Sequence, residues 1–397
     1  MQLLRKRLTN GMMVIMEPRE LPVVALSISN RFGGGFESSQ VKGIAHFIEH
    51  LVFTGTKTRT HEDISREIEK RGGILNAFTS QEVTSFWFKL PSEHVFVGLD
   101  ILSDILNNPS FGLEKFEKEK KVILEEIKMY HDDPQRGVYD NILANLYEKP
   151  FGDLITGSAK TVNGLERDFV YDYFQKMYAS EHLLVTLVGN ADFEKICSYL
   201  EEHFPVKKRV LEVLNPRKKH GESVEERPGI DQSHFIFGVH APLMNDKNYY
   251  ALEVLDAYLA NGMSSRLFLK IREDRGLAYT IQSSLSTEQS HSYYTIYVGT
   301  TKEALPEVKK IILDELILSD LKEKDLMEAK ERLIGLRKIS SEESARVMTE
   351  LLFAELIGKA EDYYAHEQKI RAVTLKQVKT LAQQLSKEYS TAAIVPR

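Results

Sequence analysis

The order of hydrophobic and polar residues along the chain predicts both strands and helices. Strand-like stretches, rich in apolar and β-branched residues, lie at 23–29, 84–90, 183–188, 234–239, 293–298 and 391–395. Helical patterns cover 43–53, 95–106, 116–130 and 305–318. Because strands and helices mix without strict βαβ alternation, we predict an α+β fold in which antiparallel-rich sheets are covered by helices.

The order of predicted elements occurs twice, at an offset of about 200 residues. In each half a segment with glycine leads through a strand to a helix, beginning at 68–80 and again at 271–281. Between the halves, the chain is rich in Lys, Arg and Glu and poor in apolar residues, as is typical of a linker. We therefore predict two similar domains from an internal duplication, at 1–206 and 229–397, joined by a charged linker at 207–228.

Length and composition are those of an ordinary globular protein. The 397 residues, 42% hydrophobic and 28% charged, are enough for two or three domains with sizeable cores. A net charge of −6 gives no reason to expect nucleic acid or an acidic membrane as a partner. Cys197, the single cysteine, allows no intrachain disulfide. The first residues lack the apolar stretch of a signal peptide and no run has membrane-spanning length, so we expect a cytoplasmic location unless a leader has been removed.

The candidate chemistry lies in the apolar helix predicted over 43–53, which contains His46-Phe47-Ile48-Glu49-His50. At helical pitch His46 and His50 lie one turn apart on the same face, and Glu49 lies beside them. Two imidazoles can hold one metal ion, and an adjacent carboxylate can transfer protons. The order His-x-x-Glu-His is the inverted form of a zinc-peptidase signature.

A catalytic zinc site usually has three protein ligands and one open position, so a third ligand must come from elsewhere. The helix predicted over 116–130 offers Glu119 and Glu126, which are seven residues apart and lie on the same side. From the spacing alone, either carboxylate could bind the metal while the other orients a ligand. A solvated, charged helix face is the competing interpretation, because Glu-Lys runs are common on protein surfaces.

The stretch from Leu8 to Tyr130 resembles the pitrilysin/insulinase family of zinc peptidases, which includes the mitochondrial processing peptidases. In that family the third ligand follows the inverted motif by about 76 residues, and Glu126 stands 76 residues after His50. The segments 43–56 and 72–80 are also similar to the family's amino-acid sequence.

This resemblance implies a role for each residue of the motif. His46, His50 and Glu126 would hold one zinc ion per chain, which the ligand types favour over manganese or cobalt. Glu49 would be the general base, and Glu119 an additional catalytic carboxylate. The fold implied is a pair of metallohydrolase-type domains, of which the second lacks the zinc motif.

A second similarity to the family covers 267–279, where Arg272 and Tyr279 are seven residues apart. The family's Arg/Tyr pair assists at the scissile carbonyl, and each such donor to an oxyanion is typically worth about 3 kcal/mol. Arg275 is a nearby competitor for the arginine role. A purely structural interpretation, an arginine on a helix followed by the start of a strand, remains open.

The resemblance also implies a site for the substrate. Asn76, Ala77 and Phe78 lie in a segment similar to the family's exposed edge strand, which holds an extended peptide by β-augmentation. Asn76 is equally compatible with a turn residue after the glycine pair at 72–73.

We therefore predict a zinc-dependent endopeptidase that hydrolyses peptides or unfolded segments bound extended in a closed chamber. The chain has the length of one subunit of the two-subunit relatives, so a homodimer is expected, with Arg272 and Tyr279 of one protomer completing the zinc site of the other. A heterodimer with a related subunit is the alternative assembly. The alternative function is a non-catalytic zinc-binding, peptide-binding or scaffold subunit of a processing-peptidase-like complex.

Overall fold

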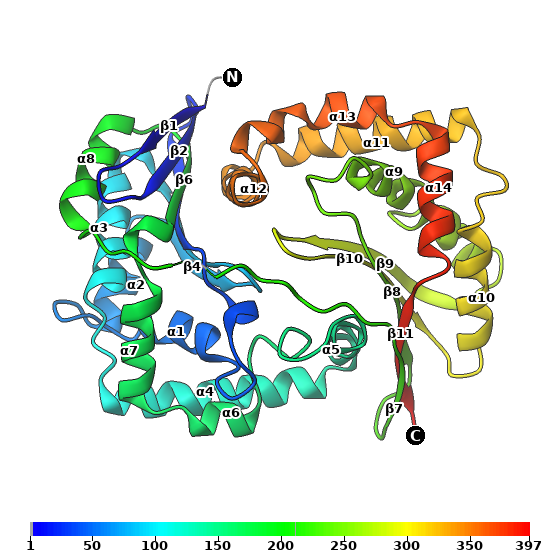
Figure 1. Ribbon diagram of the computed structural model, residues 1–397, viewed down its shortest axis with the longest axis horizontal. Helices are drawn as coiled ribbons and strands as arrows, with labels where there is room; N and C mark the ends of the chain where they lie inside the picture. The colour runs from blue at the N-terminus through cyan, green and yellow to red at the C-terminus, as the bar shows by residue number, and fades with distance from the viewer. Residues whose placement is uncertain (1–2, 211) are drawn as a thin grey trace. The chain divides into compact units, whose positions relative to one another are not determined.

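Two sheets organise the chain in the computed structural model, which describes residues 3–210 and 212–397. Each sheet belongs to its own unit of structure (Figure 1). Unit 1 consists of Met1–Ile127, Leu154–Leu214 and Ser340–Tyr363, and unit 2 of Lys128–Asp153, Asn215–Ile339 and Tyr364–Arg397. Both units combine a mainly antiparallel sheet with helices, so the predicted α+β fold of two similar domains is confirmed.

The sheet of unit 1 has six strands in the order β1-β2-β6-β3-β5-β4. Their bounds are β1 Leu4–Arg7, β2 Met13–Pro18, β3 Val23–Asn30, β4 Ile74–Thr79, β5 Thr84–Pro91 and β6 Leu183–Gly189. Only β2 and β6 pair in parallel among these strands. Strand β3 is buried along almost its whole length, which indicates that both faces of the sheet are covered. Strand β4 is an edge of this sheet.

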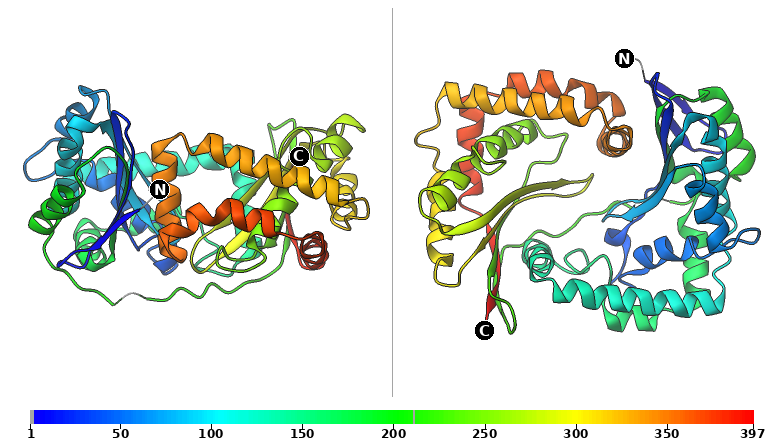
Figure 2. Two further views of the ribbon diagram at one scale, coloured as in Figure 1. Left: turned by 90° about the horizontal axis from the view of Figure 1, so that it is seen from above. Right: turned by 180° about the vertical axis from the view of Figure 1, so that it is seen from behind.

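Helices cover both faces of the first sheet (Figure 2). One face shares a core with α1 (Ile44–Val52), α2 (His61–Glu69), α3 (Val95–Asn107), α7 (Arg167–Met177) and α8 (Phe193–His203). The other face packs against α12 (Ser344–Ile357), through a cluster that includes Ala25, Val188, Met348 and Leu352. The first face is the one that matters for the candidate site, because α1 and the start of the long helix α4 (Leu113–Asp132) belong to it.

The sheet of unit 2 has five strands in the order β7-β11-β8-β10-β9. Their bounds are β7 Glu222–Arg227, β8 Ser233–His240, β9 Ala278–Thr287, β10 Ser292–Thr300 and β11 Ser390–Pro396. One face shares a core with α9 (Tyr249–Leu259), α10 (Leu305–Glu315), α11 (Glu323–Ser340), α13 (His366–Ala372) and α14 (Leu375–Leu385). Helix α5 (Pro134–Leu146) packs on the other face through Val138, Ile142 and Leu146.

The two sheets have the same strand order once β1 is set aside, which agrees with the predicted duplication. Each unit also contains one helix from the opposite half of the sequence. Helix α5 comes from the first half and packs on β8 and β11, whereas α12 comes from the second half and packs on β3 and β6. The compact units therefore cut across the limits 1–206 and 229–397, which stay a prediction about the two halves of the sequence.

Three strands differ from the sequence-based expectation. Strands β1 and β2 precede β3, so the first half does not open with the strand at 23–29. The segment expected to be a linker, 207–228, ends in β7, which pairs in parallel with β11 from Glu222 to Arg227. The side chains of β7 alternate between exposed and half-buried, so this edge strand carries little of the apolar pattern by which strands are recognised.

Candidate metal centre

Helix α1 carries three of the predicted site residues, His46, Glu49 and His50. The helix begins after Gly43, and its remaining residues are apolar and buried in the core of unit 1. This packing leaves little freedom for α1 to rotate or shift, because a close-packed core resists displacement. The polar side chains of α1 are therefore held in a defined direction.

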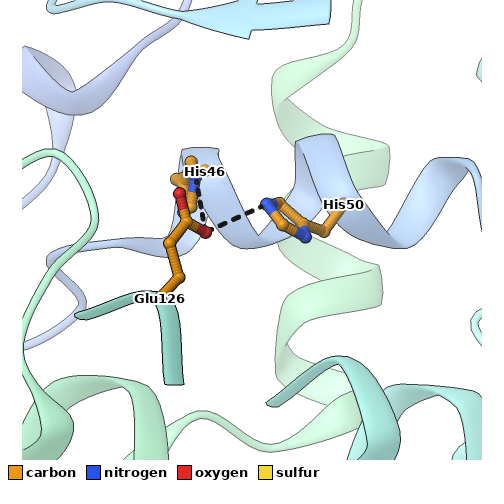
Figure 3. Close-up of side chains that lie close together, drawn as sticks. All are labelled: His46, His50 and Glu126. Carbon is orange, nitrogen blue, oxygen red and sulfur yellow. Dashed lines mark ion pairs between the residues drawn. The ribbon is translucent and has the colours of Figure 1, made fainter. Parts of the chain in front are cut away.

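Glu126, on α4, lies against both histidines (Figure 3). Its Oε2 atom is 3.7 Å from Nε2 of His46 and 3.5 Å from Nε2 of His50. One donor atom from each of the three residues lies within 4.8 Å of the other two. Over residues 3–210 and 212–397, this is the one group of three or more His, Cys, Asp or Glu side chains close enough to share a metal ion.

The donor set and its spacing fit a zinc ion. Two ligand atoms about 2.1 Å from a tetrahedral zinc ion lie about 3.4 Å apart. The distances from Oε2 of Glu126 to the two Nε2 atoms, 3.5 and 3.7 Å, are close to that value, and all three donor atoms lie within 4.8 Å of one another. Two imidazole nitrogens and one carboxylate oxygen also leave a fourth position open, as in catalytic zinc sites.

Glu119 and Glu126 contact different atoms of His50. Glu126 faces Nε2, whereas Oε2 of Glu119 lies 3.5 Å from Nδ1. A carboxylate behind the second nitrogen of a metal-binding histidine fixes the tautomer and orientation of the ring. Burial lowers the pKa of His50, but the hydrogen bond with Glu119 and the charges of Glu126, Glu49 and Glu119 outweigh burial, so the net shift is upward from 6.5.

Glu49 is held by a residue that the sequence analysis did not select. The hydroxyl of Thr79, the last residue of β4, donates to Oε2 of Glu49 at 2.5 Å. Burial raises the pKa of Glu49, the hydrogen bond from Thr79 opposes this shift, and the nearby charge of Glu126 adds to it. The alternation of β4 was the available signal, because it places Thr79 on the same face as Leu75 and Ala77, which pack towards the core that contains α1.

The predicted substrate residues lie on β4, and their side chains divide between its two faces. Ala77 shares the face of Thr79, whereas Phe78 stacks on Phe353 of α12 with ring centroids 6.2 Å apart. The side-chain oxygen of Asn76 accepts a hydrogen bond from the main-chain N–H of Ala77 at 2.8 Å. The edge position of β4 leaves main-chain groups on one side available for pairing.

Arg272 and Tyr279, which belong to unit 2, lie side by side. The guanidinium of Arg272 lies 5.0 Å from the ring centre of Tyr279 and 4.8 Å from that of Phe268. Tyr279 is 74% exposed, so its side chain is not part of the core of unit 2. Arg275 instead donates to the carbonyl of Lys270 and pairs with Glu307 on α10. The geometry therefore places Arg272, not Arg275, beside Tyr279.

Helix α9 occupies in unit 2 the position that α1 occupies in unit 1, between the equivalent strands β8 and β9. It carries Asp256, which accepts hydrogen bonds from Tyr294 at 2.7 Å and from Asn261 at 3.2 Å. In the part of unit 2 that the structure describes, no group of three metal-binding side chains occurs. The expectation of one metal ion per chain therefore depends on the group in unit 1.

Comparison with known proteins agrees with this architecture. Residues 14–157 match the model of the insulinase family, peptidase family M16, and residues 164–333 match the model of the M16 inactive domain. An uncharacterized zinc protease of Mycobacterium leprae is 32% identical over 99% of this chain and 91% of its own length. The uncharacterized zinc protease YmxG of Bacillus subtilis is 31% identical over 98% of this chain and 97% of its own.

Solved structures show the same fold. A protease from Helicobacter pylori aligns with a TM-score of 0.92 at 19% identity, covering 100% of this chain and 99% of its own. A Pseudomonas fluorescens structure described as a peptidase M16 inactive domain aligns with a TM-score of 0.90 at 18% identity, covering 100% and 98%.

Among the described residues, no helix combines the length and the apolar character needed to cross a bilayer. Relatives named as zinc proteases match over nearly the whole chain, and both family models fall on it in sequence order. This chain is therefore a member of the M16, or insulinase, family of peptidases.

Proposed function

We propose that this protein is a zinc-dependent endopeptidase that cleaves peptides or unfolded segments bound in an extended conformation. The observation that carries the proposal is the group formed by His46, His50 and Glu126, with Glu49 next to it on the same helix. Relatives named as zinc proteases support it. The intact group also argues against a scaffold without chemistry, because a scaffold has no need of three convergent metal ligands.

In the proposed mechanism, each residue of the site has a separate task. His46, His50 and Glu126 would hold the ion, and zinc, when bound, supplies a Lewis acid that polarises a carbonyl and makes water more acidic. Glu49 takes a proton from the attacking water and returns it to the leaving amine, a role suited to a carboxylate whose pKa is raised by burial. Glu119 holds the ring of His50 in its orientation.

Substrate binding is assigned to β4. An extended peptide can pair with the main-chain groups of an edge strand whatever its sequence, so Asn76, Ala77 and Phe78 would contribute mostly backbone contacts. Phe78 contacts α12 on one face of β4, whereas Leu75, Ala77 and Thr79 lie on the other face, where Thr79 contacts Glu49. We expect cleavage to depend on an unfolded substrate, because a folded protein cannot supply a free strand.

Thr79→Val is expected to lower kcat by about tenfold with little change in KM, because Glu49 loses the hydrogen bond that orients it. Thr79→Ser keeps the hydroxyl and is the matched control, which should retain most of the activity. Steady-state kinetics on one peptide would check this. Equal losses in both variants would show that Thr79 acts through packing and not through its hydroxyl.

We further propose that the protein acts as a homodimer in which Arg272 and Tyr279 of one protomer stabilise the transition state in the other. The contact between Arg272 and Tyr279 supports their acting as a pair. Mixing inactive Glu49→Gln chains with inactive Arg272→Ala chains should then restore up to about a quarter of the wild-type activity, since random pairing completes one site in half of the dimers. Titration of one variant with the other would check this, and activity that never rises on mixing would contradict it.

A non-catalytic role, in which zinc or a peptide is bound without cleavage, is the second candidate, since residues 164–333 match a domain model described as inactive. One experiment separates the two functions. The purified protein is incubated with a peptide library, with zinc and with a chelator, and the products are identified by mass spectrometry. Internal cleavage that stops with chelator and returns with zinc is expected. Binding of peptides without any new termini would overturn the endopeptidase proposal.

A further inference from the structure

The first turn of α1 is held by a carboxylate from outside the helix. Gly43, the residue before the helix, has a φ of +101° and offers no side chain to cap it. Glu37 takes this place. Its two carboxylate oxygens accept hydrogen bonds from the main-chain N–H groups of Gly43 at 2.9 Å and Ala45 at 2.6 Å. Ala45 immediately precedes His46, so the contact lies one residue from the metal group.

Glu37 is part of a buried ion pair. Glu37 and Lys42 are 1% and 2% exposed, and Nζ of Lys42 lies 4.0 Å from Oε2 of Glu37. Burial raises the pKa of Glu37 to about 7, although Lys42 and the two N–H groups lower it. Two buried charges rarely stabilise a fold more than apolar residues of the same volume would. A role in positioning accounts for the pair better than stability does.

The pair also connects α1 to the end of β4. Lys42 donates to the carbonyl of Gly34 at 2.7 Å, and the N–H of Gly34 donates to the carbonyl of Ser80 at 2.9 Å. Ser80 follows Thr79, the residue that holds Glu49. A Cβ at Gly33 would lie 2.3 Å from the carbonyl oxygen of Ser80, so the two segments approach as closely as glycine permits.

These contacts link the start of α1 to the end of β4. At the start of α1, Glu37 accepts hydrogen bonds from the N–H groups of Gly43 and Ala45. At the end of β4, Gly34 donates to Ser80, the residue after Thr79. We infer that Glu37 is a positioning residue, which with Lys42 sets α1 against β4 so that the metal-binding and proton-transferring side chains keep their relative placement. This inference deepens the proposed function and rests on it, because the side chains that Glu37 positions have their roles only in that function. It assigns no chemistry to Glu37 itself.

The test uses two variants and a matched control. Glu37→Gln keeps the size of the side chain but replaces one acceptor oxygen by an N–H₂ group, and it leaves Lys42 buried without its carboxylate. In the double variant Glu37→Gln with Lys42→Met, neither charge remains. Glu17→Gln is the control. Glu17 lies on β2, is also 1% exposed, and pairs with Arg19, whose Nε atom is 2.6 Å from Oε1 of Glu17.

Three properties are measured: thermal stability, hydrogen exchange of the α1 peptide in the metal-free protein, and zinc affinity by competition with a chelator. We expect both Glu37 variants to exchange α1 amides about tenfold faster and to bind zinc about tenfold more weakly, as is typical when a support of a metal ligand is lost. The double variant should recover stability, because no unpaired charge is left buried, but not zinc affinity. Glu17→Gln should lower stability alone.

The outcomes separate this inference from the proposed function. A wild-type protein that binds no zinc would overturn the proposed function, while hydrogen exchange in the metal-free protein still decides whether Glu37 anchors α1. If the α1 peptide exchanges at the wild-type rate in both Glu37 variants, the inference is overturned. It is also overturned if zinc affinity recovers together with stability in the double variant, because Glu37 would then serve stability alone.

Discussion

Glu49→Gln is expected to reduce peptide hydrolysis by about 10²–10⁴-fold while zinc remains bound, because the amide cannot accept the proton of the attacking water. The substitution is nearly isosteric, and its carbonyl oxygen can still accept the hydrogen bond from Thr79. The rate constants for one peptide and the zinc content of the purified variant are the two measurements. Their combination matters, because only loss of cleavage with retained metal identifies a proton-transferring group.

Glu69→Gln is a suitable control for this variant, since Glu69 is an exposed carboxylate at the end of α2 in the same unit. It should retain wild-type activity. A Glu49→Gln protein with wild-type turnover would contradict the role of general base. Loss of zinc along with activity would instead assign Glu49 to metal binding.

Glu126→Gln should weaken zinc binding by at least about 100-fold and abolish cleavage at ordinary zinc concentrations, since the effect of losing a ligand exceeds the 10–100-fold typical of its supports. The reason is geometric: one oxygen of Glu126 lies 3.7 Å from Nε2 of His46 and 3.5 Å from Nε2 of His50, so it can share a metal ion with both. Glu119→Gln should have a smaller effect, within that 10–100-fold range, because Glu119 contacts Nδ1 of His50. Competition with a chelator of known affinity measures both.

Glu125→Gln is the matched control, an exposed carboxylate one residue away on the same helix. It should bind zinc as tightly as the wild type. If Glu119→Gln lost more affinity than Glu126→Gln, the roles of the two carboxylates would have to be exchanged. If neither changed affinity, the third ligand would lie elsewhere.

The spacing of Glu119 and Glu126 illustrates what local geometry can and cannot decide. A separation of seven residues places both carboxylates on one side of α4, and the sequence can show that much. It cannot show which nitrogen of His50 each one faces, because that depends on the angle at which α4 crosses α1. Packing in the core of unit 1 sets this angle, through contacts such as that of Phe47 on α1 with Phe116 on α4.

The roles of Thr79 and Glu37 could not be predicted from the sequence for a related reason. Each acts on a residue far away in sequence or through main-chain N–H groups, and neither kind of contact leaves a periodic pattern. Strand β7 escaped because an exposed edge strand needs no apolar face. The exchange of α5 and α12 between the units is equally hidden, since an apolar helix face does not specify which sheet it covers.

What the sequence determined by itself was therefore everything that local periodicity and motif spacing encode. It specified helices α1 and α4, the strands with an apolar pattern, the duplication, and the set of side chains able to hold a metal. The resemblance to the family had already assigned Glu126 to the metal, but the tertiary structure alone decided which sheet each helix covers, which nitrogen of His50 each carboxylate faces, and which residues hold α1 and Glu49 in place. These depend on contacts between segments distant in sequence, whose geometry is set only when the cores of the two units close.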